Sequence, residues 1–149
     1  MGYTLQTDPE TTSRAVGVEL GISPKKSREV CKMLVGKKVD DAKAYLKSVA
    51  ALETPVPYTR YKMMLSPKPK VGPGRYPKKP ALAILRVLES AQSNAEYKGL
   101  DADNMRVKVA AAHRGRIEKA MMPRAQGRST PWNEQTTNIE IILEEIKAS

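Results

Sequence analysis

The sequence predicts a fold of the α+β class, with three helices and three strands in a single domain over residues 1–149. Three stretches place apolar residues at the spacing of one helix face, and three others alternate apolar and polar residues as strands do. The chain is long enough for one core and hardly for two, and 40% of its residues are apolar. We therefore expect a folded domain rather than a disordered tail.

The first strand and the first two helices are expected before residue 54. Residues 14–20 alternate with a period of two, so that one face of this strand carries Val16, Val18 and Leu20. Ser23 and Pro24 are typical of the N-cap and first residue of a helix, and Gly36 is placed to end it. The apolar face of this helix consists of Val30, Met33 and Leu34. The stripe of the second helix consists of Val39, Ala42, Leu46 and Val49.

The remaining elements lie beyond residue 79. A third helix is expected from near Pro80 to Lys98, with Gly99 as its stop. Its apolar stripe is Leu82, Leu85, Leu88 and Ala91, widened by Ile84, Val87 and Ala95. Two further strands are indicated by the alternation of Met105, Val107 and Val109, and of Ile139, Ile141 and Leu143.

Residues 110–137 join the last two strands and are too long for an ordinary hairpin loop, which has a median length of about 4–6 residues. If both strands continue outward as a two-stranded ribbon, about 14 residues on each side would reach roughly 45 Å. The sequence therefore predicts an extended β-hairpin arm over these residues, with a mobile surface loop as the alternative.

The charge of the chain indicates a polyanionic partner. Lys and Arg number 26 against 16 Asp and Glu, which gives a formal charge of +10 and a pI near 9.8. No apolar run approaches the roughly 20 residues of a membrane helix, and the N-terminus does not resemble a secretory signal, so we expect a soluble, cytoplasmic protein. Cys31 and His113 are the only residues of their types, which argues against a disulfide, a metal site or a cofactor.

The far part of the arm carries the clearest binding signal. Its cations, opposed by Glu118 alone, are Arg114, Arg116, Lys119, Arg124 and Arg128. Ordering residues 114–132 opposes folding by about 20–40 kcal/mol, whereas burying their four bulky apolar side chains returns roughly 6–12 kcal/mol. We therefore expect the segment to stay mobile until a partner holds it, and nucleic-acid phosphate is the simplest such partner.

Residues 54–79 form a second basic segment, rich in proline. Its candidate RNA-binding residues are Arg60, Lys62, Lys68, Lys70, Arg75, Tyr76, Lys78 and Lys79, with Tyr58 and Tyr61 interleaved. Cations bind phosphate, and aromatic faces stack on unpaired bases. A solvated proline-rich linker is the alternative interpretation.

Other residues are weaker candidates. Lys25, Lys26 and Arg28 lie near a helix start, where cations are unfavourable, so either phosphate contact or a solvated face is expected. His113 is expected to be exposed or to stack on a base, and Trp132 to lie in the core or to stack on a nucleotide. Cys31 is expected to fill the core.

Two motifs resemble ligand-binding loops without completing them. The stretch GPGR at 72–75 lacks the GK[ST] ending of a phosphate-binding loop and is expected to be a turn. Asp101, Asp103 and Asn104 open like a calcium loop, but the required glycine and glutamate are missing. A connection from helix to strand is the better explanation.

Three segments resemble one family, the large-subunit ribosomal proteins numbered twenty-two in bacteria and seventeen in eukaryotes. The matching strings are ISPKKSREVCKMLVGKKVDDAKAYL, ALAILRVLESAQSNAEYKGLDADNMRV and MPRAQGRSTPWNEQTTNIEIILEE. Within the last, PRAQGR at 123–128 is similar to the most recognisable string of the family, which usually has methionine where Gln126 stands. The basic insertion at 54–79 is similar to archaeal and eukaryotic members, so the resemblance indicates an archaeal source, with a eukaryotic source as the alternative.

The resemblance implies three helices packed on a three-stranded antiparallel sheet, with a protruding β-hairpin that threads through ribosomal RNA and lines the peptide exit tunnel. It implies a structural role in the large subunit, in its assembly and in translation, with the globular part near the tunnel opening. Implied partners are 23S-type rRNA, neighbouring ribosomal proteins and the nascent polypeptide at the hairpin tip. Arg116, Lys119, Arg124 and Arg128 would face RNA.

Two alternatives to a ribosomal protein follow from the residues alone. A free basic protein that organises DNA or RNA would have the same charge pattern. An RNA-cleaving enzyme would need clustered carboxylates or a pair of histidines, and the sequence suggests neither, so no catalytic residue is assigned.

Overall fold

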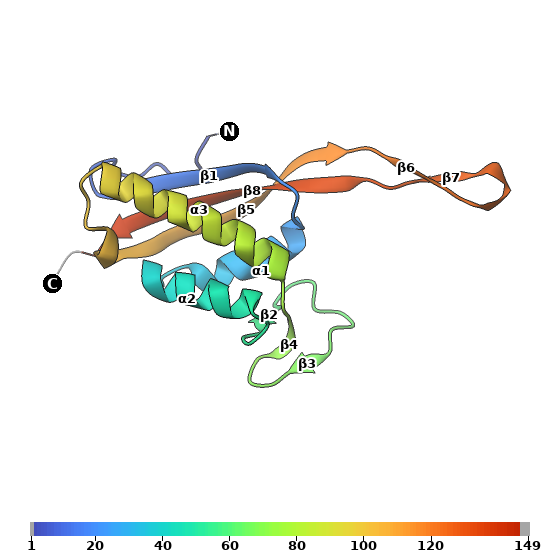
Figure 1. Cartoon of the computed structure of the whole chain (residues 1–149), viewed down its shortest axis with the longest axis horizontal. Helices are drawn as coiled ribbons and strands as arrows, with labels where there is room; N and C mark the ends of the chain where they lie inside the picture. The colour runs from blue at the N-terminus through green and yellow to red at the C-terminus, as the bar shows by residue number, and fades with distance from the viewer. Residues whose placement is uncertain (1, 147–149) are drawn as a thin grey trace.

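A computed structural model describes residues 2–146 and shows three helices on one side of a three-stranded sheet (Figure 1). The strands are β1 (Thr12–Leu20), β5 (Met105–Glu118) and β8 (Glu134–Glu145), all antiparallel, with β8 in the centre. The predicted α+β class, the three helices and the antiparallel sheet are confirmed. None of the helices in this part of the chain is long and apolar enough to cross a membrane.

The central strand supplies much of the core because its apolar residues alternate. Ile139, Ile141 and Leu143 are fully buried on the face that the helices cover. On β1 the strand is present, but the predicted grouping of its faces was wrong. Ala15 is buried on the core face and Val18 is 59% exposed, while Leu20, beyond an irregularity in the pairing with β8, packs on the core beside Gly17. A β-carbon added at Gly17 would lie 2.8 Å from Val87 Cγ2, so glycine is what lets the third helix pass this close.

Helices α1 (Pro24–Leu34) and α2 (Val39–Ala50) form where the sequence predicts them. Ser23 is the N-cap residue, yet its hydroxyl forms no capping bond; its carbonyl instead accepts from the Ser27 backbone nitrogen and hydroxyl. Gly36 ends α1 with φ of +85°, and its N–H donates to the carbonyl of Val107 in β5. The whole predicted stripe of α2 is buried.

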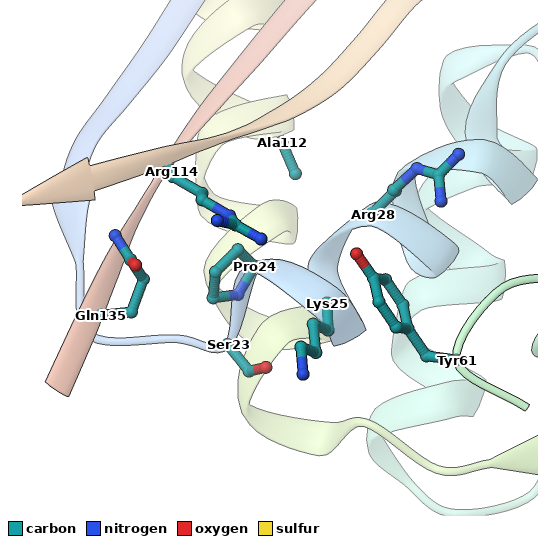
Figure 2. A pocket seen from close by; sticks show the side chains of 8 residues that line it. All are labelled: Ser23, Pro24, Lys25, Arg28, Tyr61, Ala112, Arg114 and Gln135. Atoms are coloured by element: carbon teal, nitrogen blue, oxygen red, sulfur yellow. The ribbon is translucent and has the colours of Figure 1, made fainter. Parts of the chain in front are cut away.

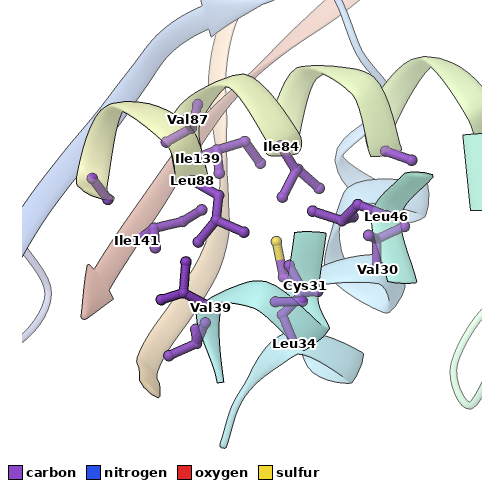
Figure 3. Packing of buried hydrophobic residues seen from close by; sticks show 14 of the residues in the cluster. Val30, Cys31, Leu34, Val39, Leu46, Ile84, Val87, Leu88, Ile139 and Ile141 are labelled. Atoms are coloured by element: carbon purple, nitrogen blue, oxygen red, sulfur yellow. The ribbon is translucent and has the colours of Figure 1, made fainter. Parts of the chain in front are cut away.

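The third helix, α3 (Lys78–Tyr97), crosses β1 and β8 and also packs on α2, while α1 lies against β5. Its buried face runs through Ile84, Val87, Leu88, Ala91 and Ala95, which includes all three residues predicted to widen the apolar stripe. Leu82, predicted to lie on the apolar face, is 41% exposed. Figure 3 shows Ile84, Val87 and Leu88 of this helix meeting side chains of α1, α2 and β8 in one cluster.

Cys31 lies inside this cluster at 2% exposure, as predicted for a core filler. Burial raises the pKa of its thiol to about 12, so almost none of it is thiolate near neutral pH.

Cys31 is therefore expected to be inert in the folded protein. At about pH 8, the folded chain should react with a chromogenic disulfide reagent roughly 10²–10³-fold more slowly than the chain unfolded in guanidinium chloride, because only the thiolate attacks. Absorbance kinetics measure both rates. Equal rates would contradict the burial of this thiol.

The proline-rich segment has its own small sheet, in the order β2 (Val56–Pro57), β4 (Gly72–Arg75), β3 (Pro67–Lys68). Strand β4 is the stretch that was predicted to be a turn, and that prediction was wrong. Gly74 permits the pairing, because a β-carbon there would lie 2.9 Å from the Val56 carbonyl oxygen. Val56 and Tyr58 are buried in the main core, so Tyr58 is not available to stack on a base as the sequence suggested.

The arm is a continuation of β5 and β8 beyond the sheet, as Figure 1 shows. Past Glu118 it is extended by β6 (Met121–Pro123) and β7 (Ser129–Pro131), which pair with each other, and a short turn at Ala125–Gly127 closes its tip. Trp132 is 52% exposed, which excludes the predicted alternative of a core position. Residues 102–104 form a short helical connection before β5, as predicted.

Candidate nucleic-acid interface

A cleft opens where the arm, α1 and the proline-rich segment meet (Figure 2). Its volume is about 450 Å³. It is lined by Ser23, Pro24, Lys25, Arg28, Tyr61, Ala112, Arg114 and Gln135. Three groups of candidate residues that are far apart in the sequence therefore meet in one place.

The cleft concentrates positive charge around an aromatic ring. Lys25, Arg28 and Arg114 all line it and all are exposed. The Lys25 ammonium lies 5.3 Å from the centre of the Tyr61 ring, and the Arg60 guanidinium lies at the same distance from that centre. Charges of one sign at a concave surface raise the local concentration of an oppositely charged ligand, and phosphate is the matching group.

A buried carboxylate positions the Tyr61 side of the cleft. Glu29 is 1% exposed, and its oxygens accept from the Thr59 backbone nitrogen at 2.9 Å, the Thr59 hydroxyl at 3.1 Å and the Arg60 backbone nitrogen at 3.3 Å. Arg28 approaches the same carboxylate to 4.0 Å. Glu29 was not among the residues predicted from the sequence, because a glutamate in a charged helix is normally exposed.

The root of the arm forms the opposite side of the cleft. The pairing of β5 with β8 is irregular between Arg114 and Ile117. Gln135 Nε2 donates to the Gly115 carbonyl at 2.9 Å, and the Thr136 hydroxyl donates to the Arg116 carbonyl at 2.8 Å. Such irregularities tend to bend a strand, and this one lies where the arm leaves the sheet.

Gly115→Ala is expected to lower the free energy of unfolding by about 1–3 kcal/mol. The added β-carbon would lie 2.5 Å from Thr136 Oγ1 and 3.2 Å from Asn138 Oδ1, so either the Thr136 side chain gives up its bond to the Arg116 carbonyl or the strands shift apart. Gly21→Ala is the matched control, because nothing lies within 4 Å of its β-carbon position. Urea denaturation of both variants tests this, and equal stability of the two would contradict the crowding at Gly115.

The other candidate residues of the arm stay on its surface. Arg116, Lys119, Arg124, Gln126, Arg128 and Trp132 are all exposed. Within residues 2–146, no ion pair involves any arginine or lysine of the arm between Arg114 and Arg128. At the tip, Gln126 has φ of 59° and the Arg124 N–H donates to the Arg128 carbonyl at 2.8 Å.

The candidates of the proline-rich segment form a separate group. Lys68, Arg75 and Tyr76 line a hollow of about 430 Å³, with the Lys68 ammonium 5.8 Å from the centre of the Tyr76 ring. Arg60, Lys62, Lys70, Lys78 and Lys79 are exposed, as is Lys26 on α1. None of these residues lines the cleft, although the Arg60 guanidinium lies beside the Tyr61 ring.

His113 differs from the expectation of a freely exposed side chain. It is half-buried, with Nε2 3.3 Å from Glu140 Oε2 and 3.2 Å from the Thr4 hydroxyl oxygen. Glu140 is fully buried and also accepts from the backbone nitrogen of Thr4 at 2.9 Å. His113 thus helps to hold the N-terminal segment against the sheet.

No metal site accompanies the cleft, since no cluster of three or more potential ligand side chains occurs among the residues that the structure describes. What the cleft offers to a ligand is cations, an aromatic ring and a few polar groups.

Comparison with known proteins gives a match over most of the chain. Residues 15–144 match the family described as Ribosomal protein L22p/L17e. Relatives named large ribosomal subunit protein uL22 include one from Methanopyrus kandleri, 46% identical over 144 residues that cover 94% of this chain and 91% of the relative. Another, from Methanococcoides burtonii, is 44% identical over 146 residues, with 97% of each chain covered. A third, from Methanococcus maripaludis strain C5, is 47% identical and covers 96% of this chain and 95% of its own.

Proposed function

From the premise that this chain belongs to the ribosomal protein L22p/L17e family and is an archaeal-type protein of the large ribosomal subunit, we propose that it binds large-subunit rRNA through three surfaces. These surfaces are the cleft, the exposed face of the proline-rich segment and the arm. As a structural component of the cytoplasmic ribosome it is not an enzyme, in agreement with the sequence analysis.

The observation that supports rRNA binding most strongly is the convergence at the cleft. Lys25 and Arg28 from α1, Arg114 from the arm and Tyr61 from the proline-rich segment line one concave surface. RNA supplies both chemistries that this surface accepts, phosphates for the cations and bases for the ring.

The arm is the part that we propose reaches into the particle. It projects away from the helices (Figure 1), and its arginines and lysines are exposed without ion-pair partners among residues 2–146. An extended cationic ribbon suits a narrow passage between RNA helices, where phosphates lie on several sides. We propose that it lines the wall of the peptide exit tunnel, that the globular part lies near the tunnel opening, and that the tip contacts the nascent polypeptide.

The same arrangement supports a role in assembly. A chain that contacts RNA at the cleft, the proline-rich segment and the tip connects RNA segments that are distant from one another. Because the three surfaces belong to one chain, binding of RNA at one surface raises the effective concentration of RNA at the other two. Contacts with neighbouring ribosomal proteins are expected on the surfaces that remain.

The protein is expected to sediment with the large subunit when a cell lysate is centrifuged through a sucrose gradient at moderate salt. The free protein should also bind its cognate large-subunit rRNA more tightly than duplex DNA at matched salt. Recovery wholly at the top of the gradient would contradict the proposal. Equal affinity for duplex DNA would favour a free architectural protein instead.

A further inference from the structure

We propose that the cleft binds a single unpaired nucleotide of RNA, with its base stacked on Tyr61 and its phosphate held by Lys25, Arg28 and Arg114. This inference rests on the rRNA binding proposed above and specifies what one of the three surfaces recognises. It concerns the shape of the RNA at that point: an extruded nucleotide rather than the side of a double helix.

The dimensions of the cleft favour a single nucleotide. Its volume of about 450 Å³ is within the range of roughly 300–1,000 Å³ in which proteins bind small ligands. A base in an A-form duplex is paired and stacked on its neighbours, so its face cannot reach a concave site. A duplex could place phosphates only at the rim, which would leave the Tyr61 ring unused.

The position of Tyr61 indicates a constructed site. The two residues before it, Thr59 and Arg60, are fixed by the buried Glu29 carboxylate. Tyr61 itself has φ of 42°, a left-handed conformation that is rare for a bulky side chain and persists only when its surroundings impose it. Figure 2 shows its ring facing the start of α1 across the cleft.

The cation beside the ring does not prevent stacking. A cation above an exposed aromatic ring contributes about 0.5–1 kcal/mol, whereas stacking of a base contributes about 1–3 kcal/mol. The Lys25 ammonium, 5.3 Å from the ring centre, sits on a flexible stem and can move to the phosphate when a base takes its place. Stacking therefore outweighs the loss of the contact between Lys25 and the ring, and Lys25 gains a phosphate contact.

Two polar groups of the lining are placed to bind the edge of the nucleotide. The Gln135 amide is held by its bond to the Gly115 carbonyl, which leaves an oxygen as acceptor for a base amino group or the ribose 2′-hydroxyl. The Ser23 hydroxyl forms no capping bond with α1 and can donate or accept. The 2′-hydroxyl is the group by which such a site would distinguish RNA from DNA.

The test compares the wild type with three cleft variants and one control variant for binding to in vitro transcribed large-subunit rRNA over a range of salt concentrations. Tyr61→Leu should weaken binding about 5- to 150-fold, the loss of one stacked base, with the salt dependence unchanged. Tyr61→Phe, which keeps the ring, should bind like the wild type. Arg114→Gln should instead reduce the slope of log K against log salt by about 0.7–0.9, the value for one phosphate contact. Tyr97→Leu is the matched control, since Tyr97 is 94% exposed and outside the cleft.

Chemical probing of the same complexes separates this inference from the proposed function. Wild-type protein and Tyr61→Phe should protect one unpaired nucleotide that becomes reactive again with Tyr61→Leu, while the hydroxyl-radical footprint on the flanking backbone persists. A backbone footprint with no such nucleotide, or unchanged protection by Tyr61→Leu, would overturn the cleft assignment alone. No footprint with the wild type would overturn rRNA binding itself, and the assignment with it.

Discussion

A protein with a shortened arm is expected to fold normally and to bind rRNA about 100-fold more weakly at physiological salt. The change removes residues 119–133 and joins Glu118 to Glu134 through Asn-Gly. Glu118 and Glu134 already pair in register, so a two-residue turn closes the ribbon there. None of the removed residues belongs to the buried core, so the melting temperature should stay close to that of the wild type.

The loss of affinity follows from the removal of Lys119, Arg124 and Arg128, all exposed. Each phosphate contact contributes about 0.7–0.9 to the salt dependence, so the slope should fall by about 2–3. Titrations at several salt concentrations measure it, and calorimetry measures the melting temperature. A full-length control with the three cations changed to glutamine should show the same change in slope. A large fall in melting temperature on truncation would show instead that the arm packs on the core.

The sequence was sufficient for the elements whose pattern is local. The stripe of Val39, Ala42, Leu46 and Val49 is buried as predicted, because helix periodicity depends on neighbours within two turns. The alternation in β8 and the end of α3 at Gly99, whose φ is +75°, were also predicted from local patterns. The length of residues 110–137, between two strand patterns, was enough to predict an arm.

What the sequence missed depends on contacts between distant segments. Alternation in β1 could not reveal which face is buried, because that depends on α3 approaching within 2.8 Å of the β-carbon position of Gly17. The proline spacing at 54–79 concealed a three-stranded sheet, since its pairing needs Gly74 beside Val56. In the candidate site, Lys25, Arg28 and Arg114 were named as separate candidates, but only the fold brings them together.

Glu29→Ala is expected to lower the free energy of unfolding by about 3 kcal/mol or more. Three hydrogen bonds to this carboxylate are lost, and each hydrogen bond to a charged group contributes about 1.5–3 kcal/mol. Because Thr59 and Arg60 are exposed, water replaces part of the bonding that they lose. The cavity left beside the core adds to the loss. Urea denaturation measures the change, with Glu89→Ala on the exposed face of α3 as the control.

The same substitution tests whether Glu29 positions Tyr61 as well as stabilising the fold. Without the carboxylate, residues 59–61 lose the bonds that keep the ring over the cleft, so limited proteolysis should cut this segment while the core resists. Glu29→Gln keeps one acceptor oxygen and should lie between the alanine variant and the wild type in both measurements. If Glu29→Ala is less stable but its segment at 59–61 stays resistant, then the local backbone, with its left-handed Tyr61, holds the ring by itself. The two contributions can be separated because one acts on the whole fold and the other on three residues at the edge of the cleft.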